Sequence, residues 1–191
     1  MNSRRVPLLA LAATVVLLSA GCTAATPSGD PAASSATTAH PLLEGLDAVA
    51  VVDTLEALPL DERPTDLRVS VRPDRLIVTD AAGEREQPLP DELFSLSVAP
   101  YVATTHDCFF HSLTTCRGEL GGASVEVRVV TDAGATLIDE TRTAADNGFV
   151  GLWLPRDISG MITLTVDGAT STATFGTGPD DPTCVTTMRL V

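Results

Sequence analysis

The second half of the chain consists largely of short runs in which apolar and polar residues alternate, separated by turn residues. Such alternation turns one face of a strand to a core and the other to water. The runs MITLTV and ATSTATF flank Asp167-Gly168, and a two-residue Asp-Gly connection is a strong hairpin signal. Similar runs extend from FSLSVAPYV to CVTTMRLV. They predict about five to seven strands over residues 93–191, in a mainly antiparallel region that resembles a sandwich or a barrel.

The residues before this region have a different period. Residues 42–60 place apolar side chains three or four positions apart, which predicts one amphipathic helix ended by Pro59 and Pro64. LRVSV and RLIVT then alternate around the turn RPD and predict the first strands of a small antiparallel sheet. We therefore expect an α+β fold, in which a small α+β N-terminal domain at residues 41–92 precedes a β-rich domain at residues 93–191.

The N-terminus has the features of a bacterial export signal. Residues 1–21 contain a short basic start and an apolar run that is too short to cross a bilayer. The run ends in LSAGC, which resembles a lipobox, a motif whose cysteine is lipidated and becomes the first mature residue. Cys22 is therefore the expected lipidation site, and an ordinary signal with a coincidental cysteine is the alternative. Residues 22–40, rich in Ala, Ser, Thr and Pro, predict a flexible tether between this anchor and the folded part.

The charge balance excludes one class of partner. The chain has 25 acidic and 12 basic residues, a net charge of -13. Nucleic-acid binding requires clustered positive charge, which this chain lacks. We therefore expect no nucleic-acid partner, and we expect membrane contact to occur through the lipid anchor at Cys22.

Potential metal ligands are concentrated in one short segment. His106, Cys108, His111 and Cys116 lie within eleven consecutive residues, and Cys184 is the third cysteine that remains after lipidation. The flanking residues are typical of a loop, and a loop held between strands can bring its side chains together. Thiolate and imidazole are ligands that suit Cu(I) and zinc. The pattern indicates a metal or redox site.

The same cysteines allow a second interpretation. Exported proteins lie in an oxidising compartment, so two of the three thiols can form a structural disulfide and leave the third free. An oxidised Cys108–Cys116 pair, for example, would remove two thiolates from a metal site. The chain contains no C-x-x-C pair, no H-E-x-x-H and no phosphate-binding glycine loop. No catalytic residues are predicted.

Three stretches of the chain resemble a known family. They are SVAPYVATTHDCFFHSLTTCRGEL, DNGFVGLWLPRDISG and GPDDPTCVTTMRL, between about Ser95 and Leu190. In this order they are similar to the periplasmic copper-binding protein family CueP, whereas residues 42–89 match only loosely. The resemblance implies that the metal ligands are Cys108, Cys116, Cys184, His106 and His111.

The resemblance also implies a function. Members are associated with copper resistance and with delivery of copper to exported Cu,Zn superoxide dismutase. We therefore expect a membrane-anchored, extracytoplasmic copper-binding lipoprotein that sequesters copper, chiefly as Cu(I), or passes it to such a cuproenzyme, with zinc as a competing ion. The alternatives are a thiol-based reductase of Cu(II) or Fe(III), and a metal-free β-domain with one structural disulfide. The sequence is compatible with a homodimer.

Overall fold

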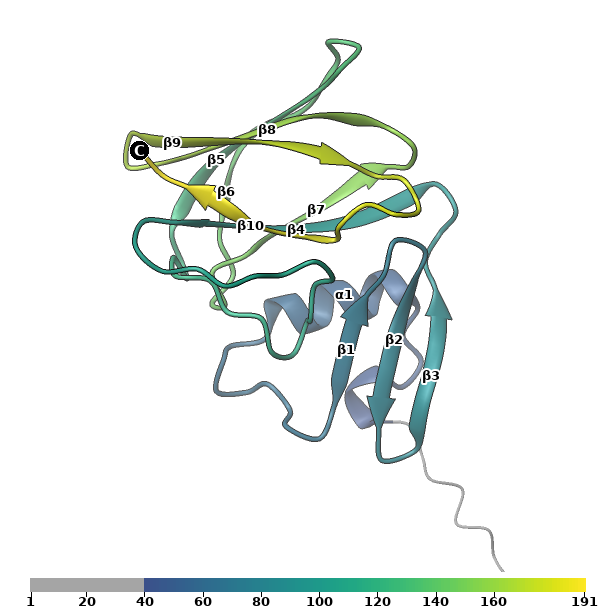
Figure 1. Cartoon of the computed structure of the whole chain (residues 1–191). Coiled ribbons are helices and arrows are strands. Elements are labelled where there is room, and N and C mark those ends of the chain that lie inside the picture. Colours follow the sequence, from purple (N-terminus) through teal and green to yellow (C-terminus); the bar gives the residue numbers. More distant parts are fainter. Residues whose placement is uncertain (1–39) are drawn as a thin grey trace, which may run out of the picture. The chain divides into compact units, whose positions relative to one another are not determined.

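The computed structural model describes residues 40–191, and these residues belong to one compact unit. The export signal, the lipidation site at Cys22 and the tether lie outside the described residues, so those interpretations stay predictions. The described part is mostly β, with antiparallel sheets and one short α-helix (Figure 1). Its strands are β1 (Arg68–Val71), β2 (Arg75–Asp80), β3 (Gly83–Pro88), β4 (Leu93–Tyr101), β5 (Ser124–Thr131), β6 (Thr136–Thr143), β7 (Val150–Pro155), β8 (Ser159–Val166), β9 (Ala169–Gly176) and β10 (Cys184–Arg189).

The helical part is shorter than the sequence period predicts. A single turn of 3-10 helix, η1 (Pro41–Leu43), is followed by Gly45 at φ 73° and then by the helix α1 (Ala48–Ala57). The side chain of Asp47 accepts a hydrogen bond of 2.8 Å from the backbone nitrogen of Ala50. This N-cap satisfies one of the free N–H groups of the first turn, so the helix begins there rather than at residue 42.

The strands β1, β2 and β3 form an antiparallel sheet in that order. Helix α1 packs against it, because Val51 and Leu55 of the helix share an apolar cluster with Val69 of β1 and Leu76 of β2. Leu113, from the segment between β4 and β5, is completely buried in the same cluster. The cluster therefore joins the N-terminal elements to the segment that carries most of the candidate metal ligands.

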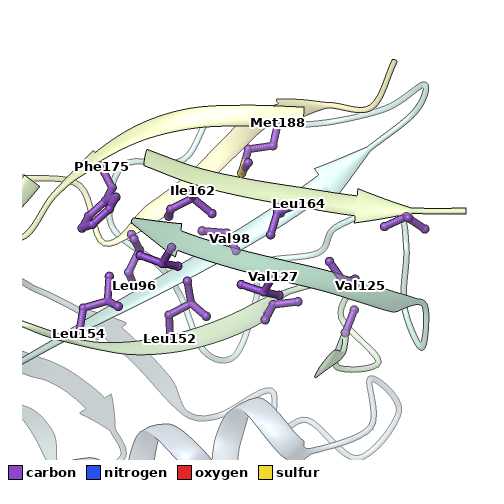
Figure 2. Close-up of a cluster of buried hydrophobic side chains, with 14 of the residues drawn as sticks. Leu96, Val98, Val125, Val127, Leu152, Leu154, Ile162, Leu164, Phe175 and Met188 are labelled. Atoms are coloured by element: carbon purple, nitrogen blue, oxygen red, sulfur yellow. The ribbon is translucent and has the colours of Figure 1, made fainter. Parts of the chain in front are cut away.

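The remaining strands form two sheets that face each other across a second apolar core (Figure 2). One sheet has the order β10-β4-β7 and the other has the order β6-β5-β8-β9. The predicted hairpin at Asp167-Gly168 is confirmed, since Val166 pairs with Ala169 and both turn residues have positive φ. The pairing of β10 with β4 is parallel, and the other strand pairs are antiparallel.

Strand β4 is buried on both faces. Leu96 and Val98 point into the sandwich, whereas Ser95 and Ser97 belong to the opposite face, where Ser97 bonds Glu56 of helix α1. Covering of both faces explains why Ser95 and Ser97 are buried although FSLSV alternates between apolar and polar residues. The division into domains at residues 41–92 and 93–191 stays a prediction.

Candidate metal centre

Two separate parts of the chain supply the candidate ligands. Cys108, His111 and Cys116 lie on the segment of residues 102–123 between β4 and β5, and Cys184 is the first residue of β10. The three sulfur atoms and a ring nitrogen of His111 all lie within 4.8 Å of one another. Parallel pairing sets Cys184 beside Ser97 of β4. The last strand therefore begins close to the segment that follows β4 and carries the other candidate ligands.

Hydrogen bonds to β1 and β10 hold the segment in place. The carbonyl of His111 accepts a bond of 2.8 Å from the nitrogen of Val71, and the nitrogen of Leu113 donates to the carbonyl of Val69 at 2.9 Å. Thr183 completes the junction, because its hydroxyl accepts from the nitrogen of His111 and donates to the carbonyl of Val71. The ligand-bearing segment is thus fixed by a strand more than thirty residues earlier and by a residue more than seventy residues later.

The cysteines are partly oxidised in this structure. Cys108 and Cys184 form a disulfide, with Cα atoms 5.7 Å apart, and buried Cys116 carries a free thiol. The Cys116 sulfur lies 3.6 Å from that of Cys108. The expectation that two of the three thiols can pair is therefore met, but the pair is not Cys108–Cys116. Spacing of eight residues made that pair appear local, whereas β10 places Cys184 closer to Cys108.

Cys116 and His111 form a buried pair in which each favours the charged form of the other. Burial by itself would raise the pKa of the Cys116 thiol, but hydrogen bonding and attraction to His111 lower it to about 7. Burial would likewise lower the pKa of His111, but the contacts with Cys116 and Glu56 raise it to about 9. Near neutral pH the pair therefore has thiolate and imidazolium character, and the thiolate is the form that binds metals and attacks disulfides.

A carboxylate on helix α1 extends this buried pair. Oε1 of Glu56 lies 2.7 Å from Nε2 of His111 and also accepts a hydrogen bond from the hydroxyl of Ser97. Oε2 accepts from the side-chain amide of Asn147 and lies 4.0 Å from the guanidinium of Arg63. Although burial opposes ionisation, these contacts hold the pKa of Glu56 below its usual value.

Sequence reasoning did not identify Glu56 or Arg63. A usable indication existed for Glu56, because it follows buried Val52 by four residues and so lies on the apolar face of the helix. An acidic residue at such a position needs a partner. The buried Arg63 has a weaker indication, since it follows the helix in a turn region, and its guanidinium donates to the carbonyl of Cys116 at 3.4 Å.

His106, the fifth predicted ligand, does not belong to the group of four converging side chains. Its carbonyl accepts a hydrogen bond from the hydroxyl of Thr186, and its ring meets that of Phe149 edge-on at 6.3 Å. Its Nε2 atom is buried without a hydrogen-bond partner within residues 40–191. His106 therefore lies near the site without converging on it, and its role as a ligand stays a prediction, as do the roles of the other four residues.

One side of the site is open to the surroundings. A cavity of about 430 Å³ is lined by Cys108 and Cys184 together with residues of β9 and β10. Phe109 is 52% exposed and stacks edge-on against the neighbouring Phe110, which carries Arg72 over its ring. The disulfide thus faces a hollow with an aromatic rim, whereas His111 and Cys116 lie behind it in the interior.

The fold and the four converging side chains define a β-rich protein with a cluster of cysteine and histidine donors of the kind that suits a soft metal ion. The family model described as "Periplasmic copper-binding protein CueP" matches residues 50–189. The chain therefore belongs to the CueP family of periplasmic copper-binding proteins.

A solved structure gives the same assignment. The structure titled "Crystal Structure of S.CueP" is 34% identical to this chain, with a TM-score of 0.73 over 78% of this chain and 91% of that chain. No curated protein matches the sequence. Within residues 40–191, no helix has the length and apolar character needed to cross a membrane.

Proposed function

We propose that this protein binds copper as Cu(I) outside the cytoplasm, through the sulfur atoms of Cys108, Cys116 and Cys184 and the imidazole of His111. The observation that carries the proposal is the convergence of these four ligand atoms within 4.8 Å. Three sulfur donors and one imidazole suit Cu(I) and do not suit hard ions. Zinc accepts the same set of donors in a tetrahedral site and is the competing ion.

Copper binding by all three sulfurs requires the Cys108–Cys184 disulfide to be reduced, because the thiolate is the metal ligand. A dithiol reductant supplies two electrons and two protons, and the disulfide becomes two thiols. The cavity beside Cys108 and Cys184 gives such a reductant a path to the sulfur atoms. The Cys116 thiolate and the ring of His111 are already in place behind them, so reduction completes the ligand set with little rearrangement, and the imidazolium releases one ring proton when the metal binds.

The proposal includes a destination for the metal. The protein sequesters copper at the membrane or passes it to an exported cuproenzyme such as Cu,Zn superoxide dismutase. The lipobox at Cys22 supports anchoring, and the open side of the site supports transfer to a partner protein. The anchor is tested by fractionation: wild-type protein is expected with membranes, and the Cys22→Ala variant is expected to be released or mislocalised. Wild-type protein recovered wholly soluble with a different N-terminus would contradict anchoring.

A reductase of Cu(II) or Fe(III) is the second candidate function, and one observation favours it. The Cys108–Cys184 disulfide is the product that such a reaction would leave. In that reaction two thiols lose two electrons and two protons and form the disulfide, while two Cu(II) ions each accept one electron. The same cysteines serve both functions, so the difference lies in whether copper stays on the protein after reduction.

One experiment separates these functions. The mature lipoprotein, in which Cys22 is acylated, is expected to show one reactive thiol per chain when oxidised and three when reduced. Reduced protein under anaerobic conditions then receives Cu(I) in competition with a calibrated chelator, and separately receives Cu(II). Retention of Cu(I) by the protein supports the binding function. If the protein that receives Cu(II) forms one disulfide per two ions and releases all of the resulting Cu(I) to a weak chelator, the reductase is supported instead.

The histidines provide a matched pair of control variants. His111→Ala is expected to weaken Cu(I) binding, because the ring nitrogen belongs to the converging group. His106→Ala is expected to weaken binding less, since its ring lies outside that group and only helps to lower the pKa of the Cys116 thiol. A loss of affinity in His106→Ala alone would contradict the proposed ligand set.

A further inference from the structure

We propose that Glu56 is a positioning residue for copper: it fixes the ring of His111 so that Nδ1, rather than Nε2, is the atom that binds the metal. This inference rests on the proposed function, since it concerns the imidazole of the same site. It assigns a role to a helix residue that lies outside the cysteine-bearing segment. It also specifies which atom of the ring is the ligand.

The geometry of the ring carries the argument. Nε2 of His111 lies 2.7 Å from Oε1 of Glu56, and Nδ1 lies 3.7 Å from the sulfur of Cys184. The ring is completely buried, and its centre is 4.5 Å from that of Phe149. A ring flip would exchange Nδ1 with Cδ2 and Nε2 with Cε1, and would turn ring carbons toward the sulfur atoms and the carboxylate. Glu56 therefore selects one orientation, in which Nδ1 faces the three sulfur atoms.

Glu56 is itself held from several directions. Its Oε1 atom accepts from Ser97 of β4 at 2.9 Å, and its Oε2 atom accepts from Asn147, which precedes β7, at 3.0 Å. Arg63, which follows the helix, has its guanidinium 4.0 Å from the same Oε2 atom. Groups from a strand and from two loops thus fix the carboxylate before any metal arrives. A partner that fixes a ligand histidine in this way commonly changes metal affinity by about 10–100-fold when it is removed.

The chain offers a matched control on the same helix. Asp53, three residues before Glu56, accepts a hydrogen bond of 3.1 Å from the indole of Trp153. It therefore also joins α1 to the β10-β4-β7 sheet, but it has no contact with His111. If Glu56 acted only by holding the helix on the sheet, Asp53→Asn and Glu56→Gln would have similar effects on copper binding.

The first test measures Cu(I) affinity of the reduced full-length protein by chelator competition. Glu56→Leu is expected to weaken binding by about tenfold or more, Glu56→Gln by less because its amide oxygen can still lie beside Nε2, and Asp53→Asn not at all. The double variant Glu56→Leu/His111→Ala is expected to bind Cu(I) no more weakly than His111→Ala alone, because both changes act through one ring. Additive losses would overturn the inference.

The second test needs no substitution. Long-range proton–nitrogen NMR spectra of reduced wild-type protein are expected to show Nε2 of His111 protonated and hydrogen-bonded, and addition of Cu(I) is expected to shift Nδ1 far more than Nε2. A larger shift at Nε2 would overturn the inference even if Glu56→Leu fails to fold.

Failure of the inference can be told apart from failure of the proposed function. If His111→Ala lowers the Cu(I) affinity of the protein but Glu56→Leu does not, the positioning role alone fails. If neither His111→Ala nor Cys116→Ser changes the affinity, the proposed function fails at this site, and the inference fails with it.

Discussion

The β sandwich and the segment of residues 102–123 are held in place by different kinds of interaction. The sandwich is filled by apolar side chains from both of its sheets, most of them fully buried (Figure 2). The segment lacks named strands and helices and is fixed by hydrogen bonds to β1 and β10, by one disulfide and by the buried side chain of Leu113. A segment fixed largely by directional bonds can turn several polar side chains toward one point. We therefore expect stability and copper binding to depend on largely separate sets of residues.

The largest expected effect tests this separation from the side of the sandwich. Leu164→Ala removes a fully buried side chain from the core and is expected to lower the free energy of unfolding by about 2–5 kcal/mol. Cu(I) affinity of the folded variant is expected to stay unchanged, because β8 contributes no ligand. Chemical denaturation and chelator competition measure the two quantities. A parallel fall in affinity would show that the two regions are coupled after all.

Oxidation tests the separation from the side of the metal centre. The Cys108–Cys184 disulfide removes two of the three proposed sulfur ligands, so oxidised protein is expected to bind Cu(I) more than about tenfold more weakly than reduced protein, because loss of one thiolate alone is expected to cost about tenfold. The comparison uses one preparation divided into oxidised and reduced halves, with thiol titration as the control. Equal affinity in both forms would mean that histidines or carboxylates hold the metal.

Single cysteine variants refine the same point. Cys184→Ser is expected to lower the Cu(I) affinity of reduced protein by at least about tenfold, roughly 1.4 kcal/mol, while circular dichroism shows an intact fold. Cys108→Ser should behave alike, and the double variant should be less than additive, because both residues act on one centre. Unchanged affinity in Cys184→Ser would confine the site to the segment between β4 and β5. Loss of folding would instead give the disulfide a structural role.

The smallest expected effect concerns pH. The pKa of Cys116 is about 7 and that of His111 is about 9, so both groups are charged, as thiolate and imidazolium, between these two pH values. The lowered thiol pKa gives stability that is lost as pH falls through about 7, and the raised imidazole pKa gives stability that is lost as pH rises through about 9. Ultraviolet absorbance of the thiolate in oxidised protein is expected to titrate near pH 7, and His111→Ala should move the midpoint upward. A wild-type midpoint at the ordinary value for a thiol would contradict the pairing.

Local sequence patterns sufficed to predict most of the strands. The alternation in MITLTV and SVEVRVV, and the Asp167-Gly168 turn, depend on residues within a few positions of each other, so their consequences can be read directly from the sequence. The helix was predicted with the wrong length, because the periodic apolar residues continue beyond the cap at Asp47 and the turn at Gly45. The mostly β character of the chain was thus accessible without a structure.

The sequence by itself also identified the candidate donors of the site. His111, Cys108 and Cys116 were conspicuous as a cluster, and the resemblance to a copper-binding family gave Cys184 its place among them. The tertiary structure decided the rest: that Cys108 pairs with Cys184, that His106 does not converge, and that Glu56 meets His111. These facts depend on parallel pairing of β10 with β4 and on helix α1 packing beside the segment. Contacts between residues tens of positions apart follow from how whole elements bury their apolar faces, and no local pattern records that arrangement.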